Sequence, residues 1–101
     1  YIVLHHQDPD LAAAVPAIEK LIDRDDLQIV THSRMSVLIK HYLVTSSYYE
    51  IDKHDYKLVT SSGFSLDFYT TPYCHSPGAF VSYEPRSKSL FSGDIFGGIE
   101  E

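Results

Sequence analysis

The sequence predicts an α/β fold in which strands and helices first alternate and strands alone then follow. In the first part of the chain, the apolar segments 1–4 and 27–31 each precede a helical pattern. In the second part, four extended segments are separated by glycine and proline: 57–60, 64–70, 79–83 and 89–91. A βαβα order followed by four strands indicates a mixed sheet with helices on one face.

Two helices are expected in the first part of the chain. Residues 11–24 predict the longer one, because their apolar side chains recur at helical spacing. These side chains are Val15, Ile18, Leu21 and Ile22. Pro16 fits the first turn of such a helix or a kink in it. A shorter helix is expected after Ser33, a residue type that commonly caps helix N-termini.

Composition and charge limit the classes of function. The 101 residues fit one small domain at most, and 44% of them are hydrophobic. The net charge of −6 without a basic run argues against nucleic-acid binding. No apolar run approaches the ~20 residues needed to cross a bilayer, so membrane insertion is not expected. Cys74 is the single cysteine and cannot form an intrachain disulfide, which makes a reducing cytoplasm the simplest location.

Metal-ligand residue types gather at three places, each just past a predicted strand. The first is the loop with alternating His6, Asp8 and Asp10, whose side chains can converge on one side of an extended segment. The second surrounds His75, and the third ends at Asp94. Loops at strand ends commonly hold functional residues, because the sheet fixes their position. The sequence therefore predicts a candidate metal site.

Each place alone also has a structural explanation. Asp10 is suited to cap a helix after a turn at Asp8. His75 alone is explained by a hydrogen-bonded loop, and Asp94 by an ordinary strand-ending turn. Cys74 adjoins His75, which raises thiolate chemistry, although a lone cysteine is more often simply buried.

The remaining histidines are expected to be structural. His5 precedes His6, and an alternating strand would direct the two side chains to opposite sides. Three further histidines lack ligand-like neighbours and are expected at the surface or in packing: His32, His41 and His54.

In combination and in this order, three motifs resemble the metallo-β-lactamase superfamily. They are His6-x-Asp8-x-Asp10, His75 and Ser92-Gly93-Asp94. The branch they resemble is that of the flavodiiron, or oxygen-binding di-iron, proteins, whose first loop is His-x-Glu-x-Asp. The hydrolases of the superfamily have His-x-His-x-Asp-His instead. Residues 90–98, LFSGDIFGG, are similar to the segment around the bridging aspartate of that branch. The resemblance spans the chain and implies part of an αβ/βα sandwich.

The resemblance also implies a ligand set. His6, Asp8 and His75 would hold one iron, Asp94 would bridge, and Asp10 would hold the second iron. A carboxylate in place of a histidine makes the site harder, which favours iron or manganese over zinc. Two metals ~3.5–4 Å apart can clamp a two-atom ligand such as dioxygen or nitric oxide.

The sequence departs from the family pattern at three points. Asp8 stands where glutamate is usual and reaches one methylene less far. Leu11 stands where many members have a histidine near the second metal. The first strands and the last metal histidine of the family have no counterpart in residues 1–101, so these residues are expected to be a partial domain. Such a domain is expected to pair with missing parts of its own protein or, as a homo-oligomer, with another copy.

Three functions are compatible with these observations. The first is a di-iron module that binds or reduces dioxygen or nitric oxide, either as a sensor joined to a signalling domain or within a flavodiiron-type reductase. No G-x-G-x-x-G fingerprint is present, so a flavin would belong to a separate domain or partner, and a rubredoxin-type protein is a possible electron donor. The second is a metal-dependent hydrolase, which Asp8 and Leu11 argue against. The third is a non-catalytic interaction domain without metals.

Overall fold

The computed structural model describes residues 1–72 and 76–95, apart from the side chain of Asp10. It contains seven strands, three α-helices and two 3-10 turns within these ranges. In chain order they are β1 (Ile2–Val3), α1 (Pro9–Ala12), α2 (Val15–Ile22), β2 (Gln28–Thr31), α3 (Ser33–Ile39), η1 (Lys40–Tyr42), β3 (Ser47–Glu50), η2 (Ile51–Lys53), β4 (Lys57–Val59), β5 (Ser65–Thr70), β6 (Phe80–Glu84) and β7 (Ser89–Phe91).

The first three strands form a parallel sheet in the order β1-β2-β3. Ile2 pairs with Ile29, and Ile29 pairs in turn with Tyr48. Each connection between these strands contains a helix, as parallel pairing requires. The backbone N–H of Leu4 donates to the Val30 carbonyl at 2.9 Å, which extends the pairing of β1 toward the loop that follows it.

The last four strands form an antiparallel sheet in the order β4-β5-β6-β7. Leu66 of β5 pairs with Leu58 of β4, and Ser82 of β6 pairs with Phe91 of β7. Short turns connect β4 to β5 and β6 to β7, because antiparallel strands need no crossover. The predicted strands therefore sort by direction into two sheets.

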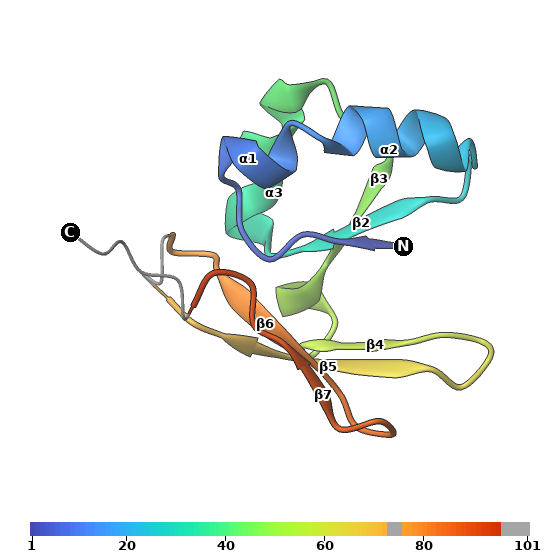
Figure 1. The fold of residues 1–101 in the computed structure, drawn as a ribbon, viewed down its shortest axis with the longest axis vertical. Helices are drawn as coiled ribbons and strands as arrows, with labels where there is room; N and C mark the ends of the chain where they lie inside the picture. The colour runs from blue at the N-terminus through green and yellow to red at the C-terminus, as the bar shows by residue number, and fades with distance from the viewer. Residues whose placement is uncertain (73–75, 96–101) are drawn as a thin grey trace.

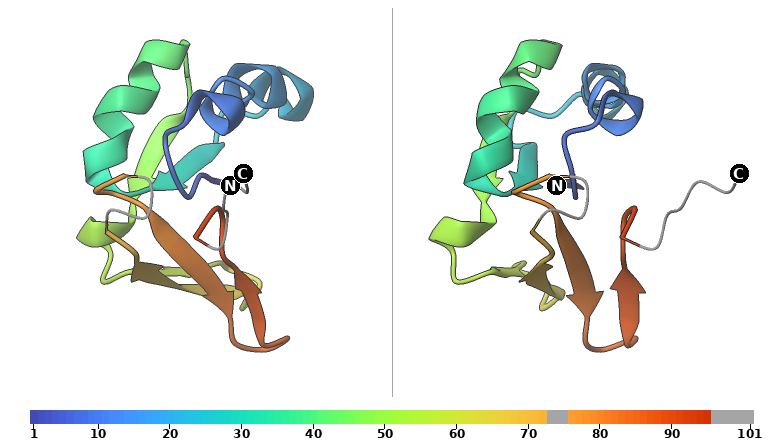
Figure 2. Two further views of the ribbon diagram at one scale, coloured as in Figure 1. Left: turned by 60° about the vertical axis from the view of Figure 1, so that its left-hand side comes forward. Right: turned by 90° about the vertical axis from the view of Figure 1, so that its left-hand side faces the viewer.

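The two sheets form separate layers, and the predicted α/β class is confirmed. Helices α1, α2 and α3 cover one side of the parallel sheet, and the antiparallel sheet lies on its other side (Figures 1 and 2). This arrangement agrees with the expected part of an αβ/βα sandwich. Core side chains come from both layers: Leu4, Ala12, Val15, Ile29, Val30, Met35, Ile39, Ile51, Leu58, Leu66, Phe68 and Phe80.

The helical segment expected over 11–24 is two helices in the structure. Helix α1 ends at Ala12, and Pro16 lies in the first turn of α2, where a missing N–H costs little. The apolar face predicted for this segment is only partly covered, since Val15 is buried but Leu21 is 85% exposed. Nothing among the described residues packs over that outer part of α2.

Local signals gave two N-caps incorrectly and missed one strand. The N-cap of α1 is Asp8 and not Asp10. The N-cap of α3 is His32, whose Nδ1 accepts from the Arg34 N–H, while the Ser33 hydroxyl donates to Asp52 at 2.6 Å. Strand β3 had no clear signal, because its polar and aromatic side chains are mostly half-buried. No helix among the described residues is long and apolar enough to span a membrane.

Candidate metal centre

The loop between β1 and α1 is held to the parallel sheet at its start. The Thr31 hydroxyl is buried and donates to the Leu4 carbonyl at 3.1 Å, next to the bond between Leu4 and Val30. The loop then enters α1, whose first residue is Pro9. His6 and Asp8 therefore lie on a short segment fixed by a strand at one end and a helix at the other.

His6 is buried, with only 2% of its surface exposed. Its Nδ1 accepts a hydrogen bond from the Asp8 backbone N–H at 3.2 Å and lies 3.6 Å from Asp8 Oδ2. A neutral imidazole with this contact carries its proton on Nε2. Asp8 is the N-cap of α1 but makes no side-chain capping bond, so its carboxylate is directed to His6 and not to the helix backbone.

Asp94 reaches the same place from the other sheet. It follows β7 in a turn where Gly93 has φ +55°, a left-handed conformation that side chains with a Cβ disfavour. Asp94 Oδ2 lies 3.1 Å from His6 Nε2. This distance brings the His6 imidazole and the Asp94 carboxylate within reach of one ion.

Together, His6, Asp8 and Asp94 form a group that fits a metal ion. One ligand atom from each lies within 4.8 Å of the other two. Donors that share an ion at ~2.1 Å each lie at most ~4.2 Å apart, so a small movement suffices to bring all three onto one ion. One imidazole with two carboxylates is a hard donor set that suits iron or manganese. The carboxylates are 39% and 45% exposed, so an ion has a path from solvent.

The other predicted ligands are not placed by the structure. Asp10 lies in α1, and its side chain is outside the described part of the chain. His75 also lies outside the described residues, as does Cys74. Leu11 of α1 is 41% exposed.

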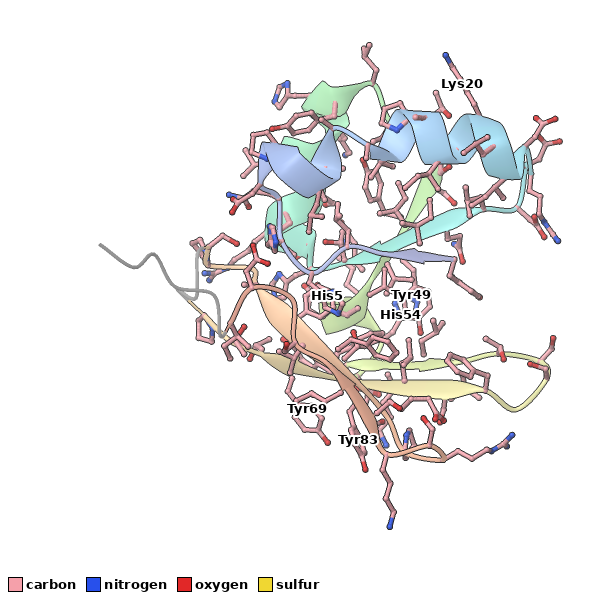
Figure 3. All side chains as sticks on the ribbon, viewed as in Figure 1. His5, Lys20, Tyr49, His54, Tyr69 and Tyr83 are labelled. Carbon is pink, nitrogen blue, oxygen red and sulfur yellow. The ribbon has the colours of Figure 1, made fainter. Side chains whose placement is uncertain are left out.

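His5 points away from the cluster and toward the antiparallel sheet (Figure 3). Its Nε2 lies 2.7 Å from the Ser82 hydroxyl, and its ring lies 5.1 Å from that of Phe80. Burial, with a smaller contribution from His6, lowers the pKa of His5 below its ordinary value. The ring is thus neutral near pH 7. The alternation of His5 and His6 gave this direction in the sequence, but no local signal identified Ser82 as the partner.

A pocket that the sequence did not reveal lies beside Asp8. Its volume is about 360 Å³, and it is lined by Gln7, Asp8, Pro9, Leu38, His41 and Tyr42. His41 and Tyr42 come from η1, which is remote in sequence from the His6 loop. The packing of α3 and η1 beside α1 forms this pocket, so motif spacing alone could not predict it.

Comparison with known proteins gives one family and several relatives. The family model described as "ODP family beta lactamase" matches residues 1–101. "Nitric oxide reductase" of Moorella thermoacetica is 32% identical over 97 residues, which are 96% of this chain and 24% of that protein. "Anaerobic nitric oxide reductase flavorubredoxin" of Enterobacter sp. strain 638 is 27% identical over 97 residues, 96% of this chain and 20% of that protein.

A third relative is "Putative diflavin flavoprotein A 2" of Synechocystis sp. It is 24% identical over 98 residues, which are 96% of this chain and 16% of that protein. The chain therefore spans between 16% and 24% of the length of these three relatives.

Proposed function

Because this chain belongs to the ODP family of beta-lactamase-fold proteins, we propose that it forms part of a non-haem di-iron centre which binds or reduces dioxygen or nitric oxide. The observation that supports this proposal most is the convergence of His6, Asp8 and Asp94. They come from both sheets and meet at positions where the family pattern has ligands. Residues 1–101 are proposed to be part of one metallo-β-lactamase-fold domain.

The proposed ligand set contains five residues. His6 and Asp8 would share one iron with His75, Asp94 would bridge, and Asp10 would hold the second iron. When bound, the metals supply Lewis-acid and electron-transfer chemistry toward a two-atom ligand. The His6 ring is held in place by burial, with only 2% of its surface exposed. Binding at Nε2 would place the single proton of the neutral ring on Nδ1, where the Asp8 N–H now donates.

We propose that the electron donor and the remaining part of the domain lie outside residues 1–101. Two of the relatives are named as nitric oxide reductases, and two carry a flavin-type name. We propose a flavin on a separate domain or partner as the electron source, or an attached signalling domain if the centre acts as a sensor. We propose that such a domain or a second copy of the chain packs against residues 1–101. A reducing cytoplasm fits a chain with one cysteine.

Metal content tests this proposal directly. The full chain would be produced with iron, purified without oxygen and measured by inductively coupled plasma mass spectrometry, with His6→Ala and Asp94→Ala alongside. We expect about two irons per centre in the parent and a clear loss in both variants. Asp67→Ala is the matched control, because this carboxylate lies on β5 and faces Lys57 at 3.9 Å. Unchanged metal content in both ligand variants would contradict the proposal.

Binding and turnover of dioxygen or nitric oxide distinguish a sensor from a reductase. The iron-loaded chain is expected to give new absorption bands with nitric oxide or dioxygen. A sensor binds dioxygen without sustained turnover, whereas a reductase consumes it when reduced flavin is supplied. Zinc as the bound metal together with turnover of nitrocefin would instead favour the hydrolase.

A further inference from the structure

His5 links the proposed metal loop to the antiparallel sheet, although it holds no metal itself. It lies between the two sheets, directly before His6 in the chain (Figure 3). Its side chain contacts β6, whereas the His6 side chain faces Asp8 and Asp94. Two neighbouring histidines thus have different roles because an extended backbone directs them to opposite sides.

Three contacts join His5 to β6. Its Nε2 is 2.7 Å from the hydroxyl of Ser82, a residue that is almost fully buried. Its carbonyl accepts a hydrogen bond from the Phe80 backbone N–H at 3.3 Å, and its ring packs on the Phe80 ring. The backbone and the side chain of His5 therefore both fix the loop against the same strand.

Strand β6 in turn determines where Asp94 lies. Ser82 pairs with Phe91 of β7, and the chain leaves β7 through Gly93 to reach Asp94. A Cβ placed on Gly93 would lie 3.2 Å from His5 Cβ, so the turn passes directly over the histidine. His5 thus contacts both β6, the strand that pairs with β7, and the turn that leads to Asp94.

We propose that His5 is a positioning residue whose bond to Ser82 sets the separation between the His6–Asp8 loop and Asp94, and thereby the metal affinity of the centre. This inference rests on the metal-binding function proposed above. The two halves of the ligand group belong to different sheets, so a contact between the sheets controls their distance. Ligand atoms must be held within ~0.5 Å of the productive geometry, and loss of an outer hydrogen-bond partner typically costs about 10- to 100-fold in metal affinity.

Two amide substitutions separate the hydrogen bond from the bulk of the side chain. The Gln side-chain nitrogen reaches about as far as histidine Nε2, whereas that of Asn is one methylene shorter. In the full chain, we expect His5→Gln to keep metal affinity within about threefold of the parent. We expect His5→Asn and Ser82→Ala to weaken it by about tenfold or more. Ser87→Ala is the control, because Ser87 lies in the β6–β7 turn and its hydroxyl donates to Glu84 instead.

Affinity would be measured with iron(II) and cobalt(II) against a competing chelator, and the visible cobalt spectrum would report ligand geometry. Urea unfolding of the metal-free variants would separate weakened binding from a damaged fold. If His5→Asn does not fold, Ser82→Ala decides, because it keeps His5 and removes only the hydroxyl.

The outcomes distinguish this inference from the metal-binding proposal. Parent-like affinity and spectrum in both His5→Asn and Ser82→Ala would overturn the positioning role while leaving the metal centre intact. Equal weakening in His5→Gln and His5→Asn would also overturn it, because the bond to Ser82 would then not be the cause. Failure of the parent chain to bind either metal would overturn both proposals.

Discussion

His6 Nε2 lies 3.1 Å from Asp94 Oδ2, although the two residues follow strands of different sheets. The imidazole is buried, and the carboxylate is nearly half exposed. Neither sheet supplies both residues of this pair. The candidate centre is therefore a property of how the layers pack, and changes that move one layer relative to the other should affect it.

Metal binding is expected to stabilise the folded chain. An ion that binds only the folded state adds about 2.7 kcal/mol when its free concentration is one hundred times Kd. Thermal unfolding with and without iron(II) under anaerobic conditions should show a higher Tm with metal, reversed by a chelator. Asp94→Ala should remove most of this shift, and an equal shift in that variant would show that the metal binds elsewhere.

Gly93→Ala is expected to disturb both stability and metal binding. The positive φ of Gly93 alone costs an alanine about 1–2 kcal/mol, and the new Cβ would lie 3.2 Å from His5 Cβ. Gly63→Ala is the matched control, since Gly63 also has positive φ but its nearest neighbour would be an arginine side-chain nitrogen at 3.9 Å. Urea unfolding should show a loss for both variants. Metal titration should show weakened binding for Gly93→Ala alone.

Gly78→Ala is expected to destabilise the fold by overpacking. An added Cβ would lie 2.7 Å from Cγ of Met35, a fully buried side chain of α3. Overpacking of this kind costs about 1–3 kcal/mol. The free energy of unfolding would be measured with denaturant for Gly78→Ala, Met35→Ala and the double variant. The smaller side chain should relieve the contact, so the double variant should lose less stability than the two single changes together.

Glu19→Gln is expected to loosen the connection between α2 and the segment before β3. The Glu19 carboxylate accepts hydrogen bonds from the backbone N–H groups of Thr45 and Ser46 and from both hydroxyls. A neutral amide accepts these bonds less strongly, and its NH₂ faces donors, so we expect a loss of about 1 kcal/mol in unfolding free energy. Asp25→Asn, an exposed change in the turn after α2, is the control and should be nearly neutral.

Stability should fall in acid as particular carboxylates are protonated. Burial raises the pKa of Glu19, but hydrogen bonds from Ser46 and Thr45 outweigh it and hold the pKa below its ordinary value of 4.5. Hydrogen bonds from Lys53 and Ser36 likewise lower the pKa of Glu50. The unfolded chain therefore takes up protons at higher pH than the folded chain does.

The sign of the pH effect follows from these lowered values. Their contribution is complete above the ordinary carboxyl pKa and is lost as pH falls through the lowered one. Urea midpoints of the metal-free chain should be lower at pH 3 than at pH 6. Glu19→Gln should have a shallower acid dependence than the parent, and a parent whose midpoint rises in acid would contradict the assignment.

Local patterns predicted most of the strands, because burial on a sheet imposes alternation. Segments 64–70, 79–83 and 89–91 were expected as strands and correspond to β5, β6 and β7 within about one residue. Strand β3 escaped prediction because its side chains are largely polar or aromatic and half-buried. In the sequence, only Pro16 marked the break between α1 and α2. The apolar side chains of 11–24 follow one continuous helical spacing, which predicts a single helix.

The sequence by itself determined the α/β class, the family and the residue types of a candidate metal site. The motifs and the carboxylate at Asp8 resembled the flavodiiron branch of metallo-β-lactamase-fold proteins, and the family model together with the relatives confirms that resemblance. The hydrogen bonds of a helix join neighbours in sequence, and burial on a sheet imposes alternation along a strand, so local pattern suffices to identify both kinds of element.

Only the tertiary structure decided which side chains meet. The division into a parallel and an antiparallel sheet placed His6 beside Asp94 and His5 beside Ser82. These contacts join segments at opposite ends of the described chain, and their geometry is set by packing between layers. Close packing fixes such distances through many small contacts at once, which no local stretch of sequence specifies.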